Sequence, residues 1–586
     1  MITRSARPAT GERRVDAVRQ SARILRKWAG SLSNCGIIAG LLAFSAALTP
    51  TLIPRGAPEQ GALGGLCLAV GYLIGVFCRW LWRYMQLPDP AGKGGRIAPG
   101  AMAAGTGLVL AIVLWRSAGW QNAIRSPMGL GPVGAGYTFT VCLIALAVFL
   151  AILVLARLLR RLARFLTRRA EPHVPPRVAR VIGVAVTAFV FWSLTSDIAL
   201  QGAFRSLDSS YREIDGLFEP ERKQPSDPGR TGSSASLVKW AELGRMGRRY
   251  VASGPSAGQI SAMTGRPAKQ PIRVYVGLGS ADTARARAKL ALAELKRQGG
   301  FDRSVLLIIT PTGTGWVDPS AIDSIEYLHH GDIASVAMQY SYLSSPLTLL
   351  VHPENGAEAA QELFTAIYGY WSQLPRGKRP ALYLHGLSLG AMNSEKSVEL
   401  FGTVDDPIAG AVWSGPPFAS PVRRSITARR NRGSPVWLPQ FRDNRIVRFA
   451  NQDGFSVPAG TPWGNMRIAY LQYASDAIVF FDYRDLYRKP EWMKAPVGPD
   501  VSPDLQWYPI VTMAQTAMDM PLSMATPMGY GHVYAPEHYI DAWVAVTDVR
   551  DWSPEALAAL RQKLGKAARN ARAGSAAAEA YAGRGG

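Results

Sequence analysis

Residues 381–395, ALYLHGLSLGAMNSE, decide the fold of the C-terminal half of the chain. The run 381–385 consists of strand-forming residues and leads through Gly386-Leu387-Ser388-Leu389-Gly390 into a helical pattern. A G-x-S-x-G pattern between a strand and a helix is typical of a strained turn that exposes a serine, with glycines where neighbouring backbone approaches closely. The stretch predicts that Ser388 is a nucleophile; the alternative is a glycine-rich turn with an incidental serine.

Short strand-like runs alternate with helical patterns on both sides of this stretch. Helical patterns cover, for example, 283–299 and 358–374. Strands of this length separated by helices predict a mostly parallel sheet covered by helices on both faces. The predicted strands are 272–278, 304–310, 335–343, 381–385, 410–415, 445–451 and 467–475.

A serine nucleophile needs a base, and in folds built on such a turn the chain order is serine, then Asp or Glu, then His. Of the seven histidines, only His532 and His538 follow Ser388. His532 lies in the glycine-rich segment MGYGHVY, whereas His538 begins an amphipathic run and is expected to be structural. His385, directly before the turn, is expected in the core or beside the oxyanion. We therefore predict that His532 is the base.

The acid must orient the imidazole, and it is expected at the end of a late strand. Asp476 ends the segment RIAYLQYASD and precedes the apolar run AIVFF. Asp453, which follows the preceding strand, is the rival. Asp482 and Asp500 are expected to be solvated or to cap local turns. The sequence favours Asp476 and leaves Asp453 open.

An oxyanion is expected to be bound by backbone N–H groups, first that of Leu389 and then one from the loop after an early strand. The segment PTGTGW at 311–316 occupies that second place. A phosphate loop is a poor alternative because no Lys-Ser/Thr pair follows these glycines. No spacing typical of a metal site is present, and neither a metal nor a cofactor is predicted. The candidates for the second donor are Thr312, Gly313, Thr314 and Gly315.

Composition indicates that part of this 586-residue chain lies in lipid, because 48% of it is hydrophobic and only 18% is charged. Soluble chains average about 25% charged residues. Each apolar stretch before residue 205 is near the ~20 residues that cross a ~30 Å hydrocarbon core. The four cysteines, all before residue 143, exclude a disulfide scaffold and a cysteine-rich zinc site. The five predicted spans are 30–49, 61–77, 99–115, 131–156 and 181–200.

Positive charge alternates between the loops of this region. Residues 1–180 carry 23 Lys or Arg and 5 Asp or Glu, which accounts for +18 of the net charge of +23. Alternate loops hold 20 and 3 basic residues, the three being Arg55, Arg116 and Arg125. The basic side is expected in the cytoplasm. Five spans then place the C-terminal half outside the cytoplasm, and an even number would reverse this. Nucleic-acid binding is disfavoured because the excess charge lies between apolar runs.

These features predict an α-helical transmembrane bundle of about five spans followed by a mostly parallel α/β domain. The segment between them includes 219–236, which is rich in Pro, Ser and Gly and is expected to be a linker. The predicted parts are a membrane domain at 1–204, a juxtamembrane segment and linker at 205–240, a catalytic domain at 241–552, and a C-terminal helix with a flexible tail at 553–586.

Segments from nearly the whole chain resemble one known group. They include LTPTLIPR, TPTGTGWVDP, EYLHHGD, QYSYL, LYLHGLSLGA, WSGPPF, YLQYASD, GPDVSP, WYP and GHVY. Together they resemble the bacterial membrane-anchored α/β-hydrolase family with a multi-spanning N-terminal domain, whose substrate is largely unassigned. The resemblance implies an α/β-hydrolase fold with Ser388 as nucleophile, and it supports Asp476 and His532 as the partners of that serine.

The expected function is that of a multi-pass inner-membrane serine hydrolase. It would cleave a carboxylic ester, from a lipid or an acylated envelope molecule, through an acyl-enzyme. Two alternatives remain, namely an acyltransferase that uses the same acyl-enzyme, and a non-catalytic membrane scaffold with a hydrolase-like domain. The expected partners are the lipid bilayer and a small-molecule or lipid ester. No nucleic acid is expected, and the oligomeric state is not predicted.

Overall fold

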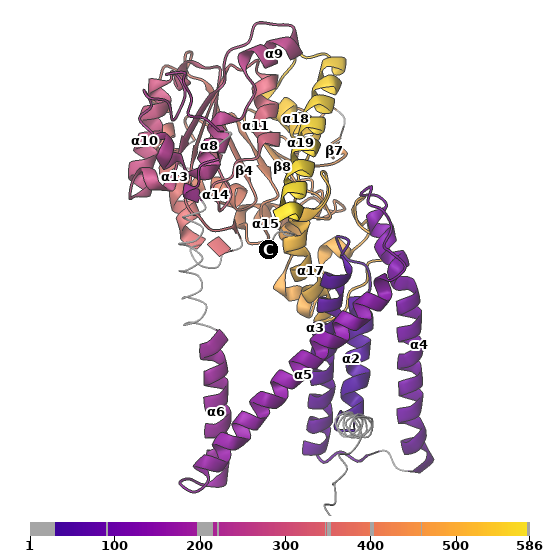
Figure 1. The fold of residues 1–586 in the computed structure, drawn as a ribbon. Coiled ribbons are helices and arrows are strands. Elements are labelled where there is room, and N and C mark those ends of the chain that lie inside the picture. The colour runs from indigo at the N-terminus through magenta and orange to yellow at the C-terminus, as the bar shows by residue number, and fades with distance from the viewer. Residues whose placement is uncertain are drawn as a thin grey trace, which may run out of the picture.

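The computed structural model describes two regions of the chain, a set of long helices and a helix-covered sheet (Figure 1). The basic segment 1–29, the end of the fifth apolar stretch with the first part of the predicted linker (196–214), and residues 583–586 lie outside the described residues. The described residues are 30–89, 92–195, 215–219, 222–345, 347–348, 353–398, 404–458 and 460–582.

Helices occupy all five predicted apolar stretches, and four of these helices are long and apolar enough to cross a membrane. The fifth, α2, has 14 residues, which corresponds to a rise of about 21 Å at 1.5 Å per residue, against a hydrocarbon core of ~30 Å. The prediction of about five spans is therefore corrected to four helices of spanning length, plus one shorter apolar helix, within the described ranges. The helices are α2 (Asn34–Ala47), α3 (Ala57–Tyr84), α4 (Gly92–Arg125), α5 (Tyr137–Ala170) and α6 (Pro176–Thr195).

Capping and proline explain why α2 is shorter than its apolar stretch. The helix begins after Ser33, whose hydroxyl accepts a hydrogen bond from the N–H of Gly36. It ends at Ala47, three residues before Pro50, which lacks the N–H needed to continue a helix. An apolar run is thus divided between a helix and the irregular segment 48–56.

Glycines bring α2 and α3 into close antiparallel contact. A Cβ at Gly75 would lie 2.3 Å from the carbonyl oxygen of Cys35, and one at Gly40 would lie 2.8 Å from that of Leu68. Small residues allow such backbone approach between membrane helices. The arginine-rich turn between α5 and α6 lies at the end of the helices remote from the sheet, and the arginine-poor segments 48–56 and 126–136 lie at the end nearest to it (Figure 1).

The sheet has eight strands in the order β1-β3-β2-β4-β5-β8-β6-β7, and every neighbouring pair is parallel except β6 and β7. All seven predicted strands are present, and the short antiparallel β7 is the one that the sequence did not reveal. The strands are β1 (Ile272–Val276), β2 (Val305–Thr310), β3 (Ile333–Met338), β4 (Ala381–Leu387), β5 (Gly410–Ser414), β6 (Val447–Asn451), β7 (Gly454–Phe455) and β8 (Arg467–Leu471).

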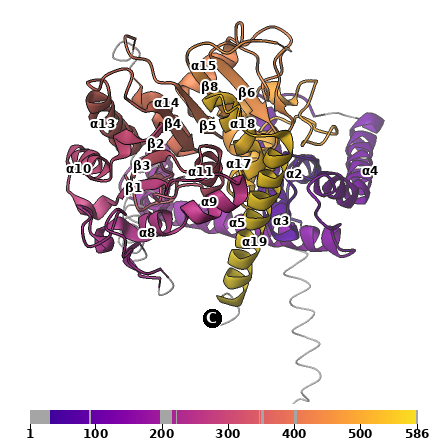
Figure 2. The same ribbon diagram turned by 90° about the horizontal axis from the view of Figure 1, so that it is seen from above.

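Helices cover both faces of the sheet, which confirms the predicted fold class. One face carries α10 (Ala284–Arg297), α13 (Pro353–Trp371) and α14 (Leu389–Ser397). The other carries α11 (Pro319–Leu328), α18 (Pro536–Thr547) and α19 (Pro554–Ala582), as Figure 2 shows for α13 and α14 against α11 and α18. The helix α19 continues to Ala582, through the end that composition predicts to be a tail.

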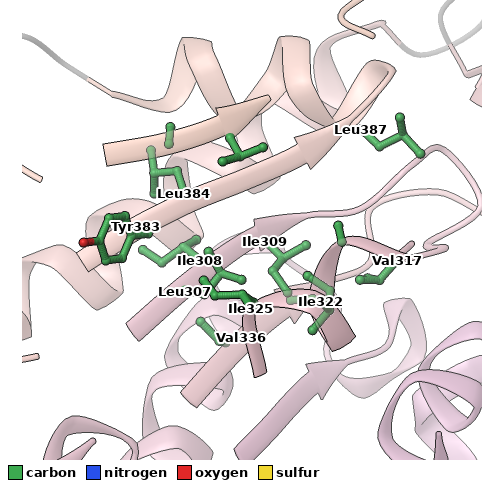
Figure 3. Packing of buried hydrophobic residues seen from close by; sticks show 14 of the residues in the cluster. Leu307, Ile308, Ile309, Val317, Ile322, Ile325, Val336, Tyr383, Leu384 and Leu387 are labelled. Atoms are coloured by element: carbon green, nitrogen blue, oxygen red, sulfur yellow. The ribbon is translucent and has the colours of Figure 1, made fainter. Parts of the chain in front are cut away.

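The centre of the sheet is mostly apolar, as expected for parallel strands covered on both faces. Ile308 of β2 lies between Val336 of β3 and Leu384 of β4, its neighbour Leu307 points to the opposite face, and Ile325 of α11 belongs to the same buried cluster (Figure 3). These side chains are all at most 3% exposed. The remaining elements are α8 (Gly244–Ala252), α9 (Ala257–Thr264), α15 (Pro421–Ala428), α16 (Ala477–Phe480), α17 (Val511–Leu522) and the 3-10 helices η1 (Trp240–Leu243), η2 (Leu278–Ser280), η3 (Gly300–Asp302), η5 (Tyr483–Leu486), η6 (Glu491–Met493) and η7 (Ser523–Ala525).

The predicted linker is irregular but packed. Its described residues 222–236 contain no helix or strand. The hydroxyl of Thr231, whose residue is 1% exposed, donates to the carbonyl of Arg273 in the edge strand β1 at 2.9 Å. The segment therefore lies against the edge of the sheet and is not a free tether.

Candidate active site

Ser388 forms the turn between β4 and α14. Its backbone has φ 58° and ψ −125°, outside the conformations that residues with a Cβ ordinarily adopt. A strained residue of this kind at the carboxyl end of a central strand is typical of functional turns. The side chain of Leu387, which ends β4, is visible at this edge in Figure 3.

The two glycines of the pattern are required by close backbone contacts. A Cβ at Gly386 would lie 2.5 Å from the carbonyl carbon of Gly390. A Cβ at Gly390 would lie 2.2 Å from the carbonyl oxygen of Thr310, at the end of β2. The G-x-S-x-G spacing thus serves a turn in which β4, α14 and the end of β2 meet.

Asp476 and His532 are paired. The Nδ1 of His532 lies 2.6 Å from Oδ2 of Asp476, and Asp476 is fully buried. The same carboxylate accepts from the hydroxyl of Tyr534 at 2.7 Å and, through Oδ1, from the N–H of Ile478 at 3.0 Å. Asp453 instead contacts Asn451. The structure therefore brings Asp476, and not Asp453, to the imidazole.

The pairing leaves the other ring nitrogen available. Nε2 of His532 is buried and has no hydrogen-bond partner in the part of the chain that the structure describes. A buried nitrogen of this kind can accept a proton from a nearby hydroxyl once substrate binds, and such contacts often tighten only in the complex.

Ser388 and His532 lie against the same piece of backbone. The N–H of Ser388 donates to the carbonyl of Ser414 at 2.9 Å. At the next residue, Gly415, a Cβ would lie 2.7 Å from Cε1 of His532. The carboxyl ends of β4 and β5 therefore gather the predicted nucleophile and the predicted base at one place, with Asp476 behind the base.

The oxyanion candidates are arranged unequally. Leu389 opens α14, so its N–H has no acceptor within the helix, and the helix N-terminus favours negative charge. The N–H groups of Thr312, Gly313 and Gly315 already donate to Trp316, Ser345 and Thr312. Among the described residues no acceptor is found for the N–H of Thr314. Leu389 and Thr314 thus keep a free donor, and the other three do not.

Asp500 was expected to be solvated or to cap a turn, and this expectation is wrong. Its side chain is buried, and Oδ2 accepts from both the N–H and the hydroxyl of Ser475, at 3.0 and 2.5 Å. The hydroxyl oxygen of Ser475 accepts from the N–H of Gly531 at 2.9 Å. Asp500 therefore holds the loop of Asp476 against the loop of His532. Its segment, GPDVSP, is among those that carry the family resemblance, and that was the available signal.

Two other histidines, His385 and His538, contact neighbouring core groups and not Asp476. Nδ1–H of His385 donates to the carbonyl of Val412 at 2.8 Å, and the ring packs against Tyr539 and Trp543. Burial lowers the pKa of His385 to about 4. His538 contacts the hydroxyl of Tyr473 at 2.5 Å.

A buried carboxyl behind the turn was not anticipated. Glu395 on α14 accepts from the hydroxyl of Tyr470 at 2.8 Å and from that of Ser420. Burial raises the pKa of Glu395 to about 7. A lone Glu inside a predicted helix carries no sequence signal of burial, because Glu usually faces solvent.

Segments from the region of the apolar helices, residues 30–195, which we call the membrane region, pack against the loop of Asp476. Leu52 and Ile53, which precede α3, form one buried apolar cluster with Val479 and Phe480 of α16, the short helix that Asp476 caps. Ile124 and Met128, at the end of α4, belong to the same cluster. The predicted acid thus rests on side chains supplied by the ends of membrane-region helices.

An ion pair makes a second link, toward the loop of His532. Arg55 and Asp519 of α17 are fully buried and pair at 2.8 Å. The carbonyl of Ser523, just after α17, accepts from the N–H of His532 at 2.9 Å. The hydroxyl of Tyr530, two residues before His532, donates to the carbonyl of Pro127. The loops of both predicted partners of Ser388 therefore contact the membrane region.

No group of three or more His, Cys, Asp or Glu side chains that could hold a metal ion is found among the described residues.

Two family models match the chain. One, described as "Alpha/beta-hydrolase family", matches residues 272–560, and the other, described as "Alpha/beta-hydrolase family N-terminus", matches residues 48–255. No curated protein and no solved structure matches. The first match runs from β1 into α19, and the second covers the segment 48–56 and the helices α3 to α6.

Proposed function

The chain belongs to the alpha/beta-hydrolase family, and from this premise we propose that it is a membrane-bound serine hydrolase that cleaves a carboxylic ester. The observation that carries the proposal is the buried pair of His532 and Asp476 beside the strained Ser388, with Nε2 of the imidazole free. A positioned serine, histidine and carboxylate of this kind are recognised by geometry and not by chain position.

In the proposed reaction Oγ of Ser388 attacks the ester carbonyl as Nε2 of His532 takes the hydroxyl proton. Asp476 stabilises the imidazolium, and the hydroxyl of Tyr534 holds that carboxylate in place. The N–H of Leu389, and that of Thr314 in the facing loop, would stabilise the oxyanion. The imidazolium then gives its proton to the leaving alcohol. A water molecule, activated by the same nitrogen, releases the acyl group from Ser388.

The location of the site supports an ester substrate near the bilayer. The loops of Asp476 and His532 contact segments at the ends of helices that are apolar enough to cross a membrane. Those ends are the arginine-poor ones. The shorter α2 runs antiparallel to α3, so that five helices still join the two ends within the described residues, and this odd number favours a position outside the cytoplasm for the catalytic domain. A lipid or an acylated envelope molecule is the substrate class that this arrangement favours.

Burst kinetics with p-nitrophenyl esters of graded chain length test the proposal on the full chain in lipid nanodiscs. The wild type is expected to release one equivalent of p-nitrophenol rapidly, followed by slower turnover, because an acyl-enzyme accumulates. Ser388→Ala is expected to lose both phases, whereas His538→Gln, at the rival histidine, keeps them.

Two outcomes would contradict the proposal. One is turnover by Ser388→Ala at the wild-type rate; the other is a folded wild-type protein that cleaves none of the esters, which would move a binding or scaffold role to the front. A burst whose second phase responds to added alcohols and not to water would indicate an acyltransferase.

A further inference from the structure

A hollow of about 390 Å³ lies between α2 and α4, beneath residues 504–508 of the catalytic domain. On α2 it is lined at positions 42, 45 and 46, with Thr49 just past the end of that helix, and on α4 at 109, 112, 113, 116 and 120. These spacings each describe one face of a helix, so two helix faces oppose one another across the hollow. Figure 1 shows α4 standing to one side of α2 and α3. The volume of the hollow is within the range of ~300–1,000 Å³ found for small-ligand sites.

The hollow is apolar at one end and polar at the other. Leu42 and Val109 line the end deeper among the helices, and Arg116, Trp120 and Asp504 line the end at the catalytic domain. Tryptophan and tyrosine are enriched where membrane meets water, and Tyr508 joins Trp120 here. The hollow therefore has an apolar end among the helices and a polar end, or mouth, at the catalytic domain. This arrangement matches the acyl chains and the headgroup of a phospholipid in a bilayer.

The polar mouth carries one charge of each sign. Arg116 and Asp504 are both exposed. Within the described ranges neither side chain forms an ion pair, and the guanidinium of Arg116 lies over the ring of Trp120, 5.7 Å from its centroid. A guanidinium suits a phosphate group, and a carboxylate suits an ammonium group.

Between these ends lies an unsatisfied hydroxyl. Ser45 lines the hollow and is 3% exposed, and its Oγ has no hydrogen-bond partner among the described residues. Buried polar groups are ordinarily paired. Ser45 lies in the last turn of α2, between Leu42 at the apolar end of the hollow and the polar end, and its hydroxyl is a suitable donor to an ester carbonyl.

We propose that this hollow binds one zwitterionic glycerophospholipid. Its phosphate lies at Arg116, its ammonium at Asp504, an ester carbonyl at Ser45, and an acyl chain between α2 and α4. The site is separate from Ser388 and does not depend on the proposed hydrolase activity, because none of its lining residues belongs to the candidate active site.

Native mass spectrometry of the full chain, with phosphatidylethanolamine and phosphatidylglycerol at equal concentration, tests the proposal. The wild type is expected to retain one phosphatidylethanolamine. Val109→Trp, which fills the hollow, is expected to lower the retained fraction at least fivefold, whereas Val184→Trp, at an exposed position of α6 outside the hollow, leaves it unchanged. Both variants are checked for folding by thermal unfolding and gel filtration.

Substitutions at the polar end of the hollow test Arg116 and Asp504 separately. Arg116→Gln is expected to weaken retention of both lipids, and Asp504→Asn to remove the preference for phosphatidylethanolamine. The proposal is overturned if Val109→Trp retains lipid as well as Val184→Trp, or if the wild type retains both lipids equally. Because no activity is read, failure of the hydrolase proposal leaves these outcomes unaffected.

Discussion

Two buried arginine–carboxylate clusters lie at opposite ends of the sheet. At the amino end of β1, Arg273 contacts Glu326 at 2.7 Å and Asp323 at 2.6 Å, both on α11. At the carboxyl end, Arg55 pairs with Asp519 at 2.8 Å. The two clusters are similar in chemistry, and Glu326 is as well buried as the pair of Arg55 and Asp519, although Asp323 is 27% exposed; the clusters differ in what they join.

At the amino end, Glu326 and Asp323 lie 53 and 50 positions from Arg273 along the chain, inside one domain. Arg55 and Asp519 lie 464 positions apart. The first cluster holds a strand to its neighbouring helix, whereas the second holds the segment before α3 to α17, which leads to His532. The difference teaches that the membrane region contacts the loops of the candidate active site, whereas the ion pairs at the amino end of the sheet join only elements of the sheet domain.

The largest expected difference between the two ends of the sheet is in the loss of catalytic activity when a serine is removed. Ser388→Ala is expected to lower kcat/KM for ester cleavage by at least ~10⁴-fold, because removal of a nucleophile leaves only residual transition-state binding. Ser324→Ala, which removes a buried hydroxyl from α11, is expected to change it by less than about threefold. Steady-state kinetics measures both, and comparable losses would remove the distinction.

The next effect separates the two candidate acids. Asp476→Asn is expected to lower kcat by ~10³–10⁴-fold, because an amide cannot hold the imidazole in the required tautomer. Asp453→Asn is expected to stay within about twofold, since it contacts Asn451 and not His532. Single-turnover rates check this, and a larger loss in Asp453→Asn would reassign the acid.

The two arginines provide the direct test of the comparison. Breaking a buried ion pair costs ~3–5 kcal/mol, so Arg55→Met and Arg273→Met are both expected to unfold at lower temperature. At a temperature where each variant is fully folded, Arg55→Met is expected to react with an ester about tenfold more slowly, because the loop of His532 loses its support. Arg273→Met should react at the wild-type rate.

A double variant serves as the control for that test. Arg55→Met with Asp519→Leu replaces the pair by apolar groups and is expected to regain much of the lost stability, because no unpaired charge stays buried. The unfolding temperature and the rate are measured on the same samples. Equal rates in Arg55→Met and Arg273→Met would show that the membrane region does not support the site.

The smallest expected effects are on the pH dependence of stability, and Glu395 and His329, at the two ends of the sheet, change stability with pH in opposite directions. Burial raises the pKa of Glu395, behind the nucleophile turn, to about 7. The folded state then binds a proton more tightly than the unfolded chain, so its contribution to stability is lost as pH rises from about 4.5 to about 7, by at most ~1.4 kcal/mol per pH unit.

His329, at the amino end, acts in the other direction. Burial lowers the pKa of His329 to about 4, so its contribution is present above pH 6.5 and is lost as the pH falls toward 4. Denaturant unfolding across pH 4 to 7.5 is expected to show that Glu395→Gln removes the first slope and His329→Gln the second. A variant that leaves its own slope in place would refute the corresponding assignment.

Local patterns were sufficient to predict the fold and to propose Ser388 and His532, but they left two candidates for the acid. The G-x-S-x-G turn is recognisable in the sequence because its two glycines are needed where backbone segments approach closely. The base could be narrowed to two candidates because only two histidines follow Ser388. Asp476 could be favoured because it ends a strand-like run. The preference over Asp453 needed the 2.6 Å contact to His532, which no spacing reveals.

Contacts between distant segments could not be predicted. Arg55 stands in a loop and Asp519 in an ordinary helix, and nothing local indicates that both are buried. Asp500 was misassigned for the same reason, since its burial depends on Ser475 and Gly531 from two other loops. The length of α2 was overestimated because an apolar run does not show where Pro50 ends the helix.

The central claim is that Ser388 is a nucleophile activated by His532 and Asp476. Its most direct test is reaction of the full chain in nanodiscs with a fluorophosphonate, followed by peptide mapping of the adduct. We predict one phosphonylated residue, Ser388, with labelling lost in His532→Ala and retained in His538→Gln. An adduct on another serine, or a folded wild-type chain that stays unlabelled, would contradict the claim.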